Sequence, residues 1–182
     1  MNIKEYLESV EACFEAIEWA GDKTLEQIID ECHRGDWLLW LAWQLKVDKR
    51  TLTLAKGHCA NTVKHLMKDE RSIAAVDADI SYGNGEITDE ELQAAAYSAS
   101  YAAYAASAAY AAYAASASAA SASYAASASY AASAAYAAAS ASAAAYAAAS
   151  AAAKEANQKE TAEICRKYLR ESIIEQFNNQ NK

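Results

Sequence analysis

Residues 92–153 read LQAAAYSASYAAYAASAAYAAYAASASAASASYAASASYAASAAYAAASASAAAYAAASAAA. This segment contains no charged residue, no glycine and no proline, whereas about one residue in three in the rest of the chain is Asp, Glu, Lys or Arg. An uncharged segment of this length is unlike ordinary solvated surface, in which charged side chains are common. We therefore expect it to be a covered core element, an assembly surface or the wall of a ligand site.

The composition of residues 92–153 predicts α-helix, because alanine has the highest intrinsic helix propensity. Tyr97, Tyr101 and Tyr104 fall on one helical face at about 100° per residue, but farther along most tyrosines and serines recur at every third position, which preserves no single face. One straight helix would span about 93 Å, far more than a compact domain of this size. We expect two or three closely packed helices with a change of face near residues 105–109. A projecting stalk that self-associates and low-complexity disorder are the alternatives.

Helix caps and apolar residues at helical spacing organise the rest of the chain. Asn2, Thr24 and Thr88 are each followed three residues later by Glu or Gln, which is the capping-box spacing, and Asp48 is a further predicted N-cap. The Gly-Asn-Gly sequence at residues 83–85 predicts a turn. Besides the Ala-rich tract, we expect helices at residues 2–21, 24–33, 35–45, 48–67, 72–81 and 154–177. Because no segment alternates with a period of two, the predicted fold is all-α.

Length and composition favour one domain over residues 1–182, built as a compact multi-helix bundle with a long Ala/Ser/Tyr-rich helical segment. The expected parts are N-terminal helices with a Trp-rich segment at 1–86, the Ala/Ser/Tyr-rich tract at 87–153, and a C-terminal helix and tail at 154–182. No lipophilic span or signal-peptide pattern is present, so we expect a cytoplasmic protein without a membrane partner, in the host cytoplasm if a phage encodes it.

The four cysteines are Cys13, Cys32, Cys59 and Cys165. All four lie on predicted buried faces and are interpreted as core thiols. The pairs Cys32-His33 and His58-Cys59 offer zinc-ligand types, but the ligands of structural zinc sites are spaced by two to four residues rather than adjacent. We expect no metal and no cofactor.

The net charge of −8 argues against a nucleic-acid duplex as partner, because phosphate contacts need a basic surface. An acidic surface suits a basic protein partner, although acidity alone is explained as well by solubility. Asp77 and Asp79 point in nearly opposite directions on a helix, so they form no catalytic pair, and both are expected to face away from its apolar side. Because phosphate loops, zinc-protease motifs and nucleophile elbows are also absent, we expect a protein that is not an enzyme.

Residues 32–43 read CHRGDWLLWLAW and contain three of the four tryptophans. Trp37, Trp40 and Trp43 would lie along one flank of a helix, where large aromatic residues are most often part of the core. The alternative is an aromatic binding wall, since Trp and Arg dominate binding hot spots. Arg34 could then reach a carboxylate or a phosphate of a ligand, while Asp36 caps the helix.

Several segments together resemble one known family. They are AIEWAGDKT at 16–24, CHRGDWLLWL at 32–41, residues 52–60 around Cys59, the Ala/Tyr tract, and CRKYL at 165–169. They cover nearly the whole chain, with RGDWLLWL as the specific part, and resemble the immunity-protein-five-like family of bacterial and phage genomes. The resemblance implies a small, all-α, non-enzymatic protein that neutralises something by binding, in bacterial immunity or in phage counter-defence. In the tract, this chain has serine where the family usually carries interspersed Asp or Arg.

Two kinds of binding function follow from these observations. The first expectation is a protein that binds and blocks a protein toxin or an immune effector, using an exposed aromatic or acidic patch. The alternative is a protein that sequesters a small nucleotide-like signalling molecule in a pocket lined by aromatic residues and Arg34. Self-association into a homo-oligomer is compatible with both. The candidate binding residues are Trp19, Arg34, Asp36, Trp37, Trp40, Tyr97, Tyr101 and Tyr104.

Overall fold

The computed structural model describes residues 1–67, 69–106 and 151–180, and in these ranges every regular element is helical. The helices are α1 (Ile3–Ser9), α2 (Phe14–Ala20), α3 (Leu25–Glu31), α4 (Gly35–Gln44), α5 (Lys49–Asn61), the 3₁₀ helix η1 (Lys64–Leu66), α6 (Glu70–Gly83), α7 (Asp89–Ala106) and α10 (Ala151–Gln180). The all-α prediction is therefore confirmed.

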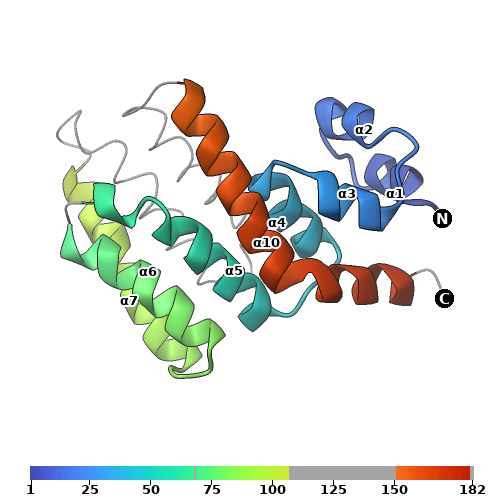
Figure 1. Cartoon of the computed structure of the whole chain (residues 1–182). Helices are drawn as coiled ribbons and strands as arrows, with labels where there is room; N and C mark the ends of the chain where they lie inside the picture. The colour runs from blue at the N-terminus through green and yellow to red at the C-terminus, as the bar shows by residue number, and fades with distance from the viewer. Residues whose placement is uncertain (68, 107–150, 181–182) are drawn as a thin grey trace.

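Helix α10 is the longest described helix and runs through the middle of the arrangement (Figure 1). It packs against α3, α4 and α5, and α5 in turn packs against α6, which packs against α7. The helices α1 and α2 contact each other and lie with α3 at the end of the molecule where both termini are found. The last helix thus joins the first half of the chain into one core.

Among the described residues, the largest hydrophobic core is formed where α3, α4 and α5 meet α10. Its fully buried members include Ile29, Leu39, Ala55 and Leu169. The first turn of α4 lies directly on α10: a Cβ atom at Gly35 would come within 2.5 Å of Thr161 Oγ1 and 2.7 Å of the Thr161 carbonyl carbon. The Cys165 thiol also donates to the Gly35 carbonyl oxygen, with an Sγ–O distance of 3.4 Å.

The caps predicted at Asn2, Thr24, Asp48 and Thr88 are all present. Both hydrogen bonds of the capping box form at Asn2 with Glu5, at Thr24 with Gln27, and at Thr88 with Glu91. Asp48 Oδ1 accepts hydrogen bonds from two backbone N–H groups in the first turn of α5. The predicted turn at residues 83–85 also forms, with Gly85 at a φ of +79°.

The prediction of one continuous helix from residue 2 to Gly21 is wrong, because α1 ends at Ser9. Glu11 adopts a φ of +54°; its N–H donates to the Glu8 carbonyl, and the N–H of Ala12 donates to the Leu7 carbonyl. This is the hydrogen-bond pattern of a Schellman motif, which ends a helix. Glycine usually occupies the residue with positive φ in this motif. Because Glu11 stands at the glycine position, nothing in the sequence marks the break.

Replacing Glu11 by glycine should raise the free energy of unfolding by about 0.5 to 1 kcal/mol, because glycine carries no steric strain at positive φ. Lys46→Gly is the matched comparison: Lys46 has a φ of +59° in the same motif at the end of α4. Urea unfolding should show a similar gain for both variants. A loss at both positions would contradict the left-handed backbone at these helix ends.

Asp79 is buried, so the prediction that it faces away from the apolar side of its helix is wrong. Its Oδ2 lies 3.0 Å from Nζ of Lys56 on α5, and each of the two side chains is only 2% exposed. Apart from this ion pair, neither atom has a hydrogen-bond partner among the described residues. The reason is that α6 is covered from two sides, by α5 and by α7. Asp77 points to solvent and pairs with Lys64, which confirms that the two carboxylates diverge.

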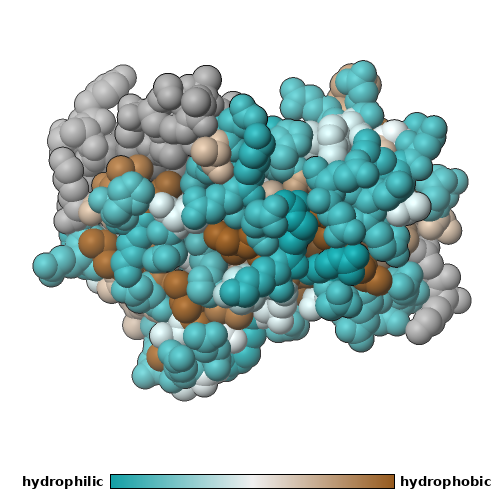
Figure 2. Space-filling model, viewed as in Figure 1, coloured by the Kyte–Doolittle hydropathy of each residue, from teal (hydrophilic) through white to brown (hydrophobic). Residues whose placement is uncertain are grey.

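The Ala-rich tract is described only at its two ends, in α7 and at the start of α10. The predicted folding back of residues 107–150 and the change of face near residues 105–109 lie outside the described residues. None of the helices that the structure describes combines the length and the apolar composition that a membrane span requires. On the face shown in Figure 2 the surface is mostly hydrophilic, and hydrophobic residues appear there as separate small patches.

Candidate binding pocket

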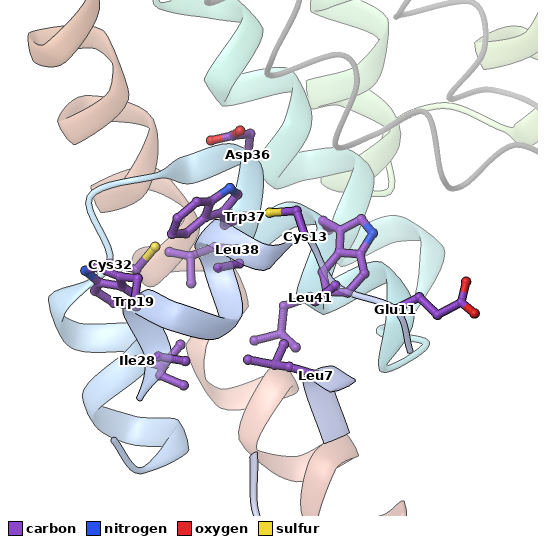
Figure 3. Close-up of a pocket in the computed structure, with 14 residues that line it drawn as sticks. Leu7, Glu11, Cys13, Trp19, Ile28, Cys32, Asp36, Trp37, Leu38 and Leu41 are labelled. Atoms are coloured by element: carbon purple, nitrogen blue, oxygen red, sulfur yellow. The ribbon is translucent and has the colours of Figure 1, made fainter. Parts of the chain in front are cut away.

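A pocket of about 480 Å³ opens between α1, α2, α3 and α4 (Figure 3). Leu7, Ile28, Leu38 and Leu41 contribute aliphatic side chains to it. Among the described residues that line it, Glu11 and Asp36 are the charged ones. Predominantly apolar lining with a few polar groups at defined places is typical of binding sites.

Three tryptophans line this pocket, Trp19 from α2 and both Trp37 and Trp40 from α4, and we name it the tryptophan pocket. The rings of Trp19 and Trp37 lie 6.0 Å apart, inclined by 58°, and Trp37 occupies the centre of Figure 3. All three are half-buried and also pack against the hydrophobic core. The core and binding-wall interpretations therefore describe the same side chains. Trp43 packs against the core as well but is not among the residues that line the pocket.

Arg34 and Asp36 bind each other at the edge of the tryptophan pocket. Arg34 Nε donates to Oδ1 at 2.8 Å and Nη2 donates to Oδ2 at 2.5 Å, and the guanidinium lies 4.7 Å from the centre of the Trp37 ring. The hydrogen bonds to Asp36 raise the pKa of Arg34. Asp36 therefore does not cap α4, contrary to the prediction, and Arg34 itself is the N-cap residue, without a side-chain hydrogen bond to the helix.

Acidic side chains dominate the α1–α2 side of the pocket mouth. Glu11 lies at one edge, and its carboxylate points away from the tryptophan rings (Figure 3). Glu15 on α2 is exposed and close enough to act on the charge of Arg34. Lys23, which follows α2, places its Nζ 4.6 Å from the centre of the Trp19 ring and donates to the Trp19 carbonyl oxygen. Glu11 and Asp36 are the charged residues that line the pocket, and since Asp36 is paired with Arg34, Glu11 leaves the mouth with a net negative charge between α1 and α2.

The tyrosines predicted as binding residues lie elsewhere. Tyr97 is on α7 and 67% exposed, and the main packing partner of α7 is α6. Tyr101 and Tyr104 belong to the end of α7, and their side chains lie outside the described residues. The predicted residues that the structure does bring together are Trp19, Arg34, Asp36, Trp37 and Trp40.

Sequence reasoning missed the wall of the pocket that α1 and α2 provide, which includes Leu7, Glu11 and Ala16. A continuous helix would have placed these residues along one rod, with Phe14 on its apolar face. In the structure Phe14 is 75% exposed, because the Schellman turn at Glu11 redirects the chain. No residue type around position 11 signals that turn, so the sequence alone held no sign of this wall.

Three of the four cysteines are buried as predicted, but Cys13 is exposed at the start of α2, where it lines the pocket. Burial raises the pKa of Cys32 to about 11 and raises the pKa of Cys165 well above its ordinary value. Cys59 and Cys165 lie with their sulfur atoms 3.8 Å apart. Among the described residues, no group of three or more His, Cys, Asp or Glu side chains is arranged to hold a metal ion.

In the folded protein, a thiol reagent such as 5,5′-dithiobis(2-nitrobenzoate) should modify Cys13 rapidly and the other cysteines only on unfolding. The reason is that thiolates are the reactive species: the three buried thiols are inaccessible, and burial raises the pKa of Cys32 and of Cys165. The absorbance of the coloured thiolate that the reagent releases, divided by the protein concentration, gives the number of reactive thiols per chain. Cys13→Ser should abolish the fast phase; a fast phase that survives this substitution would contradict the burial of the other three.

Comparison with protein-family models, with curated proteins and with solved structures finds no match to this chain. The family resemblance drawn from the sequence therefore stays a prediction, and function has to be argued from the pocket itself.

Proposed function

We propose that the protein acts by binding, and that the tryptophan pocket holds an apolar part of a protein partner whose activity is thereby blocked. The observation that carries this proposal is the set of three half-buried tryptophans around a pocket with apolar walls. Tryptophan is enriched among the few residues that carry most of the binding energy at protein interfaces. The acidic mouth supports a basic partner. The resemblance to the immunity-protein-five-like family suggests a toxin or an immune effector in this role.

A nucleotide-like ligand draws less support from the same pocket. Recognition of phosphate needs an available cation or a group of converging N–H donors. The guanidinium of Arg34 already makes two hydrogen bonds to Asp36. The charged residues that line the pocket are both carboxylates, which repel phosphate.

Filling the pocket tests the proposal. Ala16 on α2 lines the pocket, so Ala16→Phe places a ring inside it. Glu18 is exposed on the same helix and does not line the pocket, so Glu18→Phe is the matched control. We expect wild type and Glu18→Phe to capture the same protein from a bacterial extract, and Ala16→Phe to capture about tenfold less or worse, measured by quantitative mass spectrometry.

Circular dichroism and melting temperature must first show that both variants are folded. Equal capture by wild type and both variants would contradict a role for the pocket. A nucleotide released by denaturing the wild type, and missing from Ala16→Phe, would overturn the protein partner in favour of the small-ligand alternative.

A further inference from the structure

The interior of the tryptophan pocket suits an apolar group rather than a charged one. Its volume of about 480 Å³ has room for a bulky side chain and lies within the usual range for ligand pockets. Two of its three tryptophan rings are already in contact with cations of the chain itself, Trp19 with Lys23 and Trp37 with Arg34. Most of the other lining side chains are aliphatic, so burial of apolar surface is the main gain available to an occupant.

The charge at the mouth is uneven. Arg34 is compensated by Asp36 in two hydrogen bonds, so this pair presents little net charge. Glu11, at the opposite edge, has no ion-pair partner within the described part of the chain. Around it, residues 1–22 contain six Asp or Glu residues and a single lysine.

The backbone position of Glu11 is also fixed. Its backbone is closed by the two hydrogen bonds of the Schellman motif, which join residues 11 and 12 to the last turn of α1. These bonds hold residue 11 at the edge of the pocket, and its carboxylate is directed outward from the tryptophan rings (Figure 3). A group that entered the pocket would place its own neighbours beside this carboxylate.

From this combination we infer that the tryptophan pocket takes a bulky apolar side chain of the partner, and that a neighbouring Lys or Arg of the partner lies against Glu11. The inference rests on the proposed function and specifies the chemistry of the partner segment. The apolar side chain supplies affinity through burial, and the cation supplies selectivity through charge complementarity with the α1–α2 edge.

Three probes with the same ring and different charge test this inference on the full chain. They are 2-phenylethylamine, 2-phenylethanol and phenylacetate, which are a cation, a neutral molecule and an anion. The readout is the ¹⁵N–¹H signal of each indole N–H, for which Trp43, outside the pocket lining, is an internal reference. We expect the signals of Trp19, Trp37 and Trp40 to shift, and the amine to bind about tenfold more tightly than the carboxylate at low ionic strength.

This preference should fall in about 0.5 M salt, because exposed charges are then screened over a few ångströms. Glu11→Gln should remove most of it while keeping the size of the side chain. Glu8→Gln, an exposed residue of α1 that does not line the pocket, should leave it unchanged. Equal binding of all three probes, or tightest binding of phenylacetate, would overturn the inference and leave the pocket as a binding site. No shift with any probe would overturn the proposed function as well.

Discussion

Replacing Lys56 by methionine should lower the free energy of unfolding by about 3 to 5 kcal/mol at pH 7. The change removes the ammonium group 3.0 Å from the buried carboxylate of Asp79. Burial raises the pKa of Asp79 even with Lys56 in place, because a carboxylate loses its hydration in the protein interior. Without Lys56, Asp79 must either stay charged and unpaired or take up a proton at neutral pH, and both cost free energy. Urea unfolding followed by circular dichroism measures the loss.

Two further variants separate the buried charge from other effects. Lys64→Met removes the partner of the exposed Asp77 on the same helix, and the change should stay within about 1 kcal/mol. Lys56→Met combined with Asp79→Leu should recover most of the stability, because replacing a whole buried ion pair by apolar residues is often neutral or favourable. If Lys56→Met and Lys64→Met unfold at the same urea concentration, the two pairs do not differ in burial as described.

The loss of stability caused by Lys56→Met should also depend on pH, in a direction that the pKa of Asp79 determines. Because the pKa of Asp79 is raised in the native state, the native state holds this proton more tightly than the unfolded state does. The stability that the group contributes therefore falls as pH rises from about 4, the ordinary carboxyl range, through the native pKa. Lys56→Met raises that pKa further, so its deficit relative to wild type should shrink as the pH is lowered toward about 4. A deficit that grows on acidification would point to a cause other than Asp79.

The starts of α1, α3, α5 and α7 were predictable because the hydrogen bonds of their caps are local. Thr24 and Asp48 accept from N–H groups two or three residues away, so the cap can be recognised from a few consecutive letters. Helix ends were less predictable. Gly85 marks one Schellman turn, but Glu11 and Lys46 occupy the same conformation without being glycine. The break after α1, and with it one wall of the tryptophan pocket, could not be predicted for that reason.

Contacts between helices distant in sequence were beyond what periodicity can show. The apolar residues of α6 define one face, and Asp79 lies off that face, which made it look solvated. Its burial depends on how closely α5 approaches: a Cβ atom at Gly57 would lie 2.9 Å from the Asp79 Cβ. Trp19, Trp37 and Trp40 could be selected from the sequence because large aromatics are seldom fully exposed, but their meeting in one pocket depends on the packing of α2 against α4.

Replacing Gly35 by alanine should lower the free energy of unfolding by about 2 to 3 kcal/mol, although alanine is the better helix former by about 1 kcal/mol. The added Cβ would lie 2.5 Å from Thr161 Oγ1, a contact that rotation of the Thr161 side chain relieves. It would also lie 2.7 Å from the Thr161 carbonyl carbon, which belongs to the backbone, so that no side-chain rotation relieves this contact. Helix α4 would have to move away from α10, and the hydrogen bond from the Cys165 thiol to the Gly35 carbonyl would lengthen.

Thr161→Ala in the Gly35→Ala background distinguishes the two contacts, because it removes the hydroxyl and leaves the backbone clash. It should restore only part of the stability, and full restoration would mean that the helix backbones do not approach as closely as described. Since Trp37 and Trp40 follow Gly35 on α4, a displaced helix should also shift their indole N–H signals. In the RGDWLLWL segment, Gly35 then acts through packing on α10, and the tryptophans act at the pocket. If Gly35→Ala keeps the stability of the wild type and its indole signals do not shift, Gly35 does not act through packing on α10.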